Sequence, residues 1–256
     1  MRTIRAIAGS MIRELLRKKD FYVLFIFILV LLGLLSSQTF FDLEGVSRYV
    51  KDLGYSLLML FSFIIAVTFT AKQLPSEIEA RTIYPLLAKP VSRHMFILGK
   101  YFGGLVVSVI TFTLFFAVYA AFYLAGGEEG SPMLLVQGYI FGVFFLCLVV
   151  ALVLFFSNFL TLSANVTLSF ILYMIINGFS DSFRDLALFS KGAASVLYGA
   201  IYYLLPHFDF FDLRVRLTHA WDPLATWVIA AVAVYTFVYC SILLYFAGIL
   251  FGRKRL

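Results

Sequence analysis

A long stretch without charge, residues 133–180, constrains this chain more than any other feature. As a single helix it would be about 72 Å long, more than twice the roughly 30 Å hydrocarbon thickness of a bilayer. It must therefore fold back on itself, and the polar residues Ser157, Asn158, Ser163 and Asn165 mark the expected turn. The stretch thus predicts two membrane-spanning helices, at about 133–157 and 161–180.

The composition is that of a membrane protein. The chain is 62% hydrophobic and 13% charged, whereas soluble domains carry roughly 25% charged residues. No soluble fold of 256 residues hides so much apolar surface. The net charge is +6, but the basic residues lie beside apolar runs rather than on a phosphate-binding face, so we expect no nucleic-acid partner. Cys147 and Cys240 fall inside apolar segments, which excludes a disulfide framework.

Four further apolar runs complete a prediction of six spans. Spanning a bilayer takes about 20 apolar residues in a helix, and the runs at about 21–41, 54–71, 101–125 and 224–251 meet that length. Asp222 and Pro223 supply an N-cap and a proline at the first position of the last span. Residues 1–20 alternate apolar and basic positions at helical spacing, which predicts an amphipathic helix in the membrane surface. We expect one all-α integral membrane domain over residues 1–256.

The distribution of Lys and Arg predicts the orientation. With the N-terminus inside, cytosolic segments hold six before the first span, five between spans two and three, and three at the C-terminus. The outer segments hold six, four of them in the long segment 181–223, and charges in long loops matter less. Both termini are therefore expected in the cytosol. A seventh span at 187–205 would put Arg253, Lys254 and Arg255 outside, so we prefer an outer-face or re-entrant helix there.

The segment between spans two and three, residues 72–100, is charged and broken by prolines. Ser76 and Glu79 fit a capping box, which predicts a short helix beginning at about Glu77. That helix is interrupted near Pro85 and ends before Pro90, because proline disfavours helix at the preceding residue. The result is a stiff cytosolic elbow joined directly to two spans.

The sequence of this elbow resembles the coupling-helix region of ABC-2-type transporter permeases, including those of copper-enzyme maturation and multidrug-type systems. The resemblance rests on Leu-Leu-Ala-Lys-Pro-Val-Ser-Arg at residues 86–93, followed by Gly99 and Lys100. It implies an extracytoplasmic helix between spans five and six, and docking of the elbow in a groove of an ATP-binding subunit. The alternative is a solvated loop that carries orientation signals. The contact or elbow-shaping positions implied are Glu77, Glu79, Thr82, Lys89, Pro90, Arg93 and Lys100.

The chain is not expected to hydrolyse ATP itself. Gly99-Lys100-Tyr101 lacks the upstream glycine and the following Ser or Thr of a phosphate-binding loop. We therefore expect no cofactor on this chain, and ATP with Mg²⁺ on two copies of a separate ATPase subunit. The resemblance also implies a second permease copy or a related permease, in a bacterial or archaeal cytoplasmic membrane.

Polar residues in or near the spans are candidates to line a pathway or to bond neighbouring helices, since intramembrane polar groups usually face the bundle interior. Gly138 and Gly142 have the spacing of a helix-packing motif. We expect no metal site, because the histidines and aspartates at 207–219 match no metal-binding signature. The pathway candidates are Gln137, Asn165, Asn177 and Asp181.

The hypothesis favoured by these patterns is the permease subunit of an ATP-driven exporter. One alternative is a membrane anchor that transmits force to or from an ATPase without transport. Another is an intramembrane enzyme, but the chain has no Gly-x-Ser-x-Gly or His-Glu-x-x-His, and its three histidines lie outside the spans. The sequence leaves the substrate open among a lipid, a drug-like amphiphile, a peptide and a maturation factor.

Overall fold

The structure, a computed structural model, describes residues 22–23, 26–27, 29–30, 33, 46–79, 93–125, 131–189, 196–199 and 205–253. The regular structure in this part of the chain is helical. Its elements are α3 (Val46–Glu79), α5 (Arg93–Ala125), α6 (Pro132–Phe156), α7 (Leu162–Phe189), the 3₁₀ helix η2 (Phe208–Phe211), α9 (Arg214–Thr218) and α10 (Thr226–Arg253).

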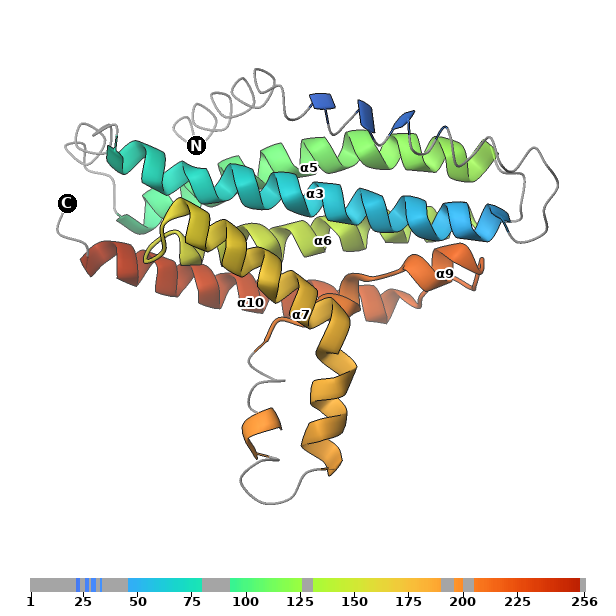
Figure 1. The fold of residues 1–256 in the computed structure, drawn as a ribbon. Helices are drawn as coiled ribbons and strands as arrows, with labels where there is room; N and C mark the ends of the chain where they lie inside the picture. Colours follow the sequence, from blue (N-terminus) through green and yellow to red (C-terminus); the bar gives the residue numbers. More distant parts are fainter. Residues whose placement is uncertain are drawn as a thin grey trace.

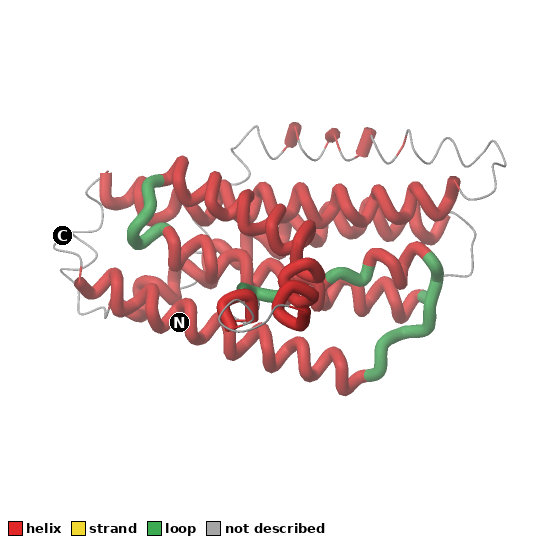
Figure 2. Tube along the Cα trace, turned by 60° about the horizontal axis from the view of Figure 1, so that its bottom comes forward, coloured by secondary structure: helices red, strands yellow, loops and turns green. Residues whose placement is uncertain are grey.

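Four long helices, α3, α5, α6 and α10, lie side by side in a bundle (Figure 1). α5 runs antiparallel to the other three helices. The start of α5 therefore lies at the same end of the bundle as the ends of α3, α6 and α10. We call the end with Glu79, Arg93, Leu162 and Arg253 the Arg93 end. The opposite end holds Val46, the start of α6 and the short helix α9, and we call it the α9 end. Figure 2 shows the described loops in green, among them the α6–α7 turn and the segment between α9 and α10.

The helices confirm an all-α membrane protein. Within the part of the chain that the structure describes, four segments are long and apolar enough to cross a bilayer, namely Lys51–Pro75, Arg93–Leu124, Pro132–Phe156 and Thr226–Arg253. The predicted fifth span is the shorter apolar part of α7, Leu162–Gly178, and the rest of α7 runs away from the bundle (Figure 1). Most of the predicted first span and all of the predicted helix at 1–20 lie outside the described residues. Six spans in a single domain therefore stay a prediction.

α6 is the central helix of the bundle and packs against α3, α5 and α10. Side chains of neighbouring elements pack directly against Gly138 and Gly142 of this helix. Leu217 and Tyr55 approach Gly138, and the ring of Phe112 lies directly on Gly142, where any Cβ would overlap it. These glycines thus make room for large buried groups on α3, α5 and α9, instead of admitting a second helix backbone.

The end of α3 differs from the prediction. The sequence predicted an N-cap at Ser76 and a new helix from about Glu77, but the helix that begins at Val46 continues through Pro75 to Glu79. A proline inside a helix removes one backbone hydrogen bond, and membrane helices tolerate this where neighbouring groups compensate. The capping pattern was therefore wrong as a start signal, because the span simply extends past it.

The start of α10 is also later than predicted. Asp222 and Pro223 were expected to begin the helix, but it starts at Thr226. The side chain of Gln137 accepts a hydrogen bond from the Leu224 backbone N–H (2.8 Å) and donates one to the Leu224 carbonyl (2.9 Å). Because both backbone groups of Leu224 are occupied by α6, the segment before α10 is held in a non-helical conformation.

Candidate functional site

The Arg93 end joins the start of α5 to the end of α10. The Arg93 guanidinium donates hydrogen bonds to the carbonyls of Phe251 (3.1 Å) and Gly252 (2.8 Å). The last carbonyls of a helix lack intrahelical partners and carry partial negative charge, so a cation there is stabilising. The next residue, His94, lies with its ring directly on Gly248. Arg93, one of the predicted elbow residues, therefore ties the elbow to the last helix of the bundle.

Lys100, another predicted elbow residue, lies inside the bundle. Its side chain is only 4% exposed, and its ammonium group lies 5.6 Å from the centre of the Phe96 ring. One turn further along α5, Gly104 lies against Gln73 and Thr70 of α3. Lys100 thus sits where α5 meets its neighbours, which fits the shaping of the elbow and leaves little surface for contact with another subunit.

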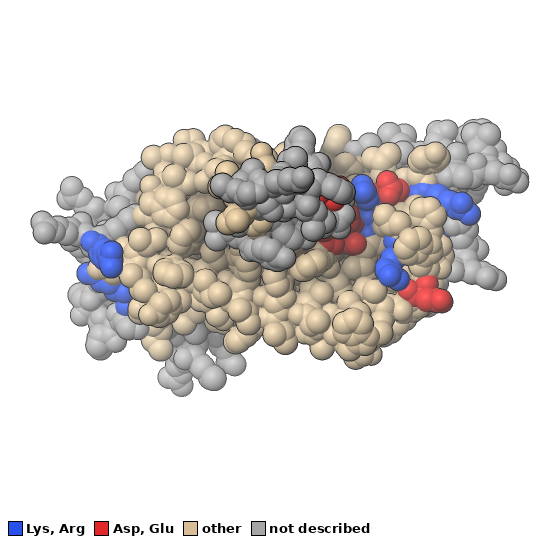
Figure 3. Space-filling view, turned by 90° about the horizontal axis from the view of Figure 1, so that it is seen from below, with Lys and Arg blue, Asp and Glu red and all other residues tan. Residues whose placement is uncertain are grey.

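The structure describes the other elbow residues only in part. Glu77 and Glu79 lie in the last turn of α3, and their side chains are not described. Thr82, Lys89 and Pro90 lie outside the described residues. Among the side chains that the structure describes, Lys and Arg gather at the Arg93 end, whereas both signs of charge lie at the α9 end (Figure 3). Docking of this elbow on another subunit stays a prediction.

Two of the four pathway candidates are buried and hydrogen-bonded to other parts of the chain. Gln137 is 1% exposed, and its side-chain amide makes the two hydrogen bonds to Leu224 described above. Asn165, also fully buried, donates to the Val153 carbonyl (3.1 Å) and to the Ser157 hydroxyl (2.8 Å). It thereby fixes the tight connection between α6 and α7, whose position near Ser157 and Asn158 the sequence predicted correctly.

The other two candidates lie further along α7. Asn177 is exposed, and its amide donates to the Tyr173 carbonyl at 2.9 Å. Asp181 lies in the helix, and its side chain is not described. Asn165 and Asn177 are about 18 Å apart along the helix axis. The structure therefore does not bring the four candidates together into one site.

Asn177 lines a cavity of about 300 Å³ between α3, α6, α7 and η2. We call it the outer pocket, after the predicted orientation. The aromatic side chains of Tyr55, Phe145, Tyr173 and Phe208 form part of its wall. Polar atoms come from Ser56, Asn177, Asp209, Asp212 and Arg214. The pocket is thus a polar chamber inside a largely apolar bundle, close to the α9 end.

An ion-pair group lies beside the outer pocket. The Arg214 Nε lies 3.5 Å from an Asp52 carboxylate oxygen and 3.8 Å from one of Asp212. The backbone N–H of Arg214 also donates to Asp212 at 2.8 Å. Sequence reasoning missed Asp52 and Arg214, because one begins a span and the other lies in a distant loop, and nothing in either local pattern signals the pairing.

The histidines and aspartates considered as metal ligands have separate partners in the structure. The His207 ring stacks on Phe210 and its backbone N–H donates to the Tyr235 hydroxyl at 3.0 Å. Asp212 pairs with Arg214, and a ring nitrogen of His219 lies 3.0 Å from the Val215 carbonyl. Partial burial lowers the pKa of the His207 imidazole, more than the Asp209 carboxylate and the backbone at Leu205 raise it. His207 is therefore held towards its neutral form.

Comparison with known families agrees with this architecture. The model of the ABC-2 family transporter protein matches residues 5–256. The chain therefore belongs to the ABC-2 family of transporter membrane proteins. A search of curated proteins found no match. Membership makes the chain the membrane component of an ABC transporter, a type of subunit that is generally not catalytic itself and that works with an ABC ATP-binding subunit.

Proposed function

We propose that this chain is the permease subunit of an ATP-driven export complex, in which a separate subunit hydrolyses ATP and drives movement of a substrate out of the cytosol. The match to the ABC-2 family over residues 5–256 is the observation that carries this proposal. ATP and Mg²⁺ would be held by the partner ATPase subunit, as the resemblance of the elbow implies. The complete complex would contain two permease and two ATP-binding subunits in a bacterial or archaeal cytoplasmic membrane.

Contacts at the Arg93 end support a route by which the ATPase acts on the bundle. α3 leads into the elbow and α5 leads out of it, and the two helices pack on each other. Arg93 and His94 in turn contact the last residues of α10. A subunit that moves the elbow would therefore displace three helices together as a rigid body, a common form of switching motion. Both chain termini would lie in the cytosol with the elbow.

The outer pocket supports a proposed outward part of the pathway. It is polar, lies near the end of the bundle opposite to the elbow, and is lined by Asn177. Gln137 and Asn165, whose side chains bond within the bundle, would act in this proposal by fixing the helices around the path. The export route would then run between α3 and α7, the helices that frame the pocket together with α6.

Co-purification with the co-expressed ATP-binding subunit tests the docking surface. We expect Glu77→Lys combined with Glu79→Lys to abolish the complex, because both residues lie in the last turn of α3, within the elbow. Asp222→Lys makes the same kind of charge change at the α9 end and should leave the complex intact. A complex that survives the double reversal would contradict docking at this surface.

ATP hydrolysis and transport in vesicles test the coupling. Arg93→Gln should leave the complex assembled but reduce substrate-stimulated ATPase activity, because the elbow loses its link to α10. Arg253→Gln removes a charge from the same end without that link and serves as the control. ATP hydrolysis with no directional movement of any substrate would favour the alternative of a force-transmitting anchor.

A further inference from the structure

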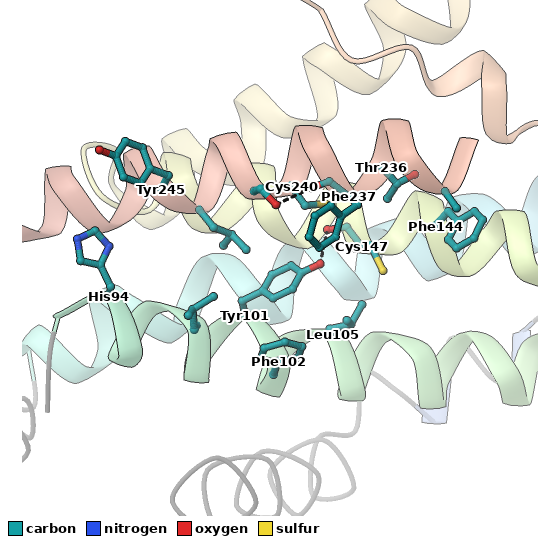
Figure 4. A pocket seen from close by; sticks show the side chains of 14 residues that line it. His94, Tyr101, Phe102, Leu105, Phe144, Cys147, Thr236, Phe237, Cys240 and Tyr245 are labelled. Atoms are coloured by element: carbon teal, nitrogen blue, oxygen red, sulfur yellow. Dashed lines mark hydrogen bonds between the residues drawn. The ribbon is translucent and has the colours of Figure 1, made fainter. Parts of the chain in front are cut away.

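A second, larger cavity lies on the other side of the bundle from the outer pocket. It has a volume of about 770 Å³ and lies between α5, α6 and α10 (Figure 4). We call it the α5–α10 groove. Large apolar side chains make most of its wall, among them Leu98, Phe102, Leu105, Phe144, Phe237 and Leu244. Phe237 is 74% exposed at the rim, so the groove borders the surface that α10 presents to lipid.

Three of the hydroxyl groups in the wall of the groove, those of Tyr101, Thr236 and Ser241, are bonded to the protein's own backbone. The Tyr101 hydroxyl donates to the Cys147 carbonyl (3.3 Å), as drawn in Figure 4. Those of Thr236 and Ser241 donate to carbonyls one turn earlier in α10, at 2.8 and 2.7 Å. With these donors engaged, the groove offers an occupant mainly apolar contact. That suits a hydrocarbon chain better than a polar molecule.

The length of the groove matches one leaflet of a bilayer. Its lining on α5 extends from His94 to Leu105, about 17 Å along the helix axis, and on α10 from Ala233 to Tyr245, about 18 Å. Half of the hydrocarbon core of a bilayer is about 15 Å. Because His94 lies at the Arg93 end, the groove runs from that end to about the middle of the bundle.

The mouth of the groove is basic. His94 belongs to its lining, Arg93 precedes it, and Arg253 lies exposed in the last turn of α10. Figure 3 shows Lys and Arg side chains at this end of the bundle. The acidic residues Glu77 and Glu79 are at the same end but on α3, which does not line the groove. Among the described side chains, the guanidinium groups of Arg93 and Arg253 would attract an anionic group at the mouth.

We propose that the α5–α10 groove binds an anionic phospholipid of the leaflet at the Arg93 end, with one acyl chain in the groove and the phosphate beside His94, Arg93 and Arg253. A helix from a second copy fits less well. Helix interfaces in membranes favour small residues that allow close approach, whereas Phe102, Phe237 and Tyr245 project around this groove. The lipid site lies apart from the outer pocket and from the proposed transport pathway.

Fluorescence quenching by brominated lipids tests the proposal without an ATP-binding subunit, so its result is independent of the export function. The two native tryptophans are first replaced, Trp221→Phe and Trp227→Phe, and Phe237→Trp then places a single reporter at the groove. Val238→Trp is the matched control, one residue away on α10, exposed, and outside the groove lining. Each protein is reconstituted in phosphatidylcholine vesicles that contain either brominated phosphatidylglycerol or brominated phosphatidylcholine.

We expect brominated phosphatidylglycerol to quench the Phe237→Trp reporter at about a fivefold lower mole fraction than brominated phosphatidylcholine, the preference that about one basic residue near an anionic lipid provides. The Val238→Trp reporter should not distinguish the two lipids. Adding His94→Gln and Arg253→Gln should remove the preference at position 237. Equal quenching by both lipids at position 237 would overturn the proposal. So would weak quenching by both, with cross-linking of Cys240 between two copies, since a second chain would then occupy the groove.

Discussion

The two ends of the bundle are held together in different ways. At the α9 end, side chains from distant parts of the sequence meet, as in the Asp52–Arg214 pair and in the Lys51 ammonium that lies 4.8 Å from the centre of the Tyr123 ring. At the Arg93 end, the Arg93 guanidinium bonds to the last carbonyls of α10, the His94 ring lies on Gly248, and the Phe96 ring stacks on that of Phe251. The α9 end thus depends on ion pairs and ring contacts to α9 and α5, whereas at the Arg93 end the start of α5 is joined to the end of α10. Four predictions probe this difference.

The largest effect is expected from the glycines. Gly142→Ala would drive a methyl group into the ring of Phe112, which is fully buried, and overpacking of a core typically costs about 1–3 kcal/mol. Gly248→Ala meets His94 instead, whose side chain is exposed and can turn away. Thermal unfolding in detergent should therefore show a clear loss for Gly142→Ala and little for Gly248→Ala. Equal losses would mean that the Arg93 end is packed as rigidly as the centre.

Gln137→Leu should give the next largest loss. It leaves the backbone N–H and carbonyl of the half-buried Leu224 without their partners. A buried polar group without a hydrogen bond costs about 1–3 kcal/mol, so we expect a loss near the lower end of that range. Asn177→Leu, at an exposed amide, is the control and should change stability much less. Hydrogen exchange should also show faster exchange at Leu224. If its exchange does not change, the Gln137 side chain is not what holds the start of α10.

The ion pair at the α9 end should contribute less. Both side chains of the Asp52–Arg214 pair are 41% exposed, and such pairs contribute about 0.2–1 kcal/mol. A double-mutant cycle with Asp52→Asn and Arg214→Gln, read by thermal unfolding, measures the coupling. We expect a small favourable value that decreases as salt is raised. A coupling that salt leaves unchanged would argue against an electrostatic origin.

The smallest effect is expected from pH at His207. Since burial lowers the folded-state pKa of this imidazole, the unfolded chain binds more protons between that lowered pKa and the ordinary value of 6.5. Stability therefore rises with pH across this window, is fully present above 6.5, and is lost as the pH falls below it. His207→Gln should flatten this part of the stability profile. An unchanged slope would assign it to other groups.

The sequence predicted the parts of the fold that depend on local pattern. The uncharged stretch at 133–180 required a helical hairpin, and α6 and α7 form it with a turn at Ser157 and Asn158. The start signals at Ser76 and at Asp222 were misleading for a related reason. Each is a valid local cap, but in one case the preceding span continues through it, and in the other α6 holds the backbone that would have begun the helix.

The contacts that fix the candidate sites could not be predicted from one sequence. Gln137 and Leu224 are 87 residues apart, and the sequence offers a polar residue in a span with no indication of its partner. Arg93 was selected because of its motif, yet its bonds to the end of α10 follow only from the folded bundle. The α5–α10 groove has no motif at all, because it arises from the shapes of three helices that meet.

The unbroken length of α3 has a mechanical consequence. Its 34 residues form a rod about 51 Å long, which exceeds the roughly 30 Å hydrocarbon core by several turns. A torque applied near Glu79 would turn the whole rod, and Asp52 and Tyr55 at its far end would swing with it. Since Asp52 is paired with Arg214, the rotation would displace α9. The shape of the outer pocket, at the far end of the bundle from Glu79, would then change.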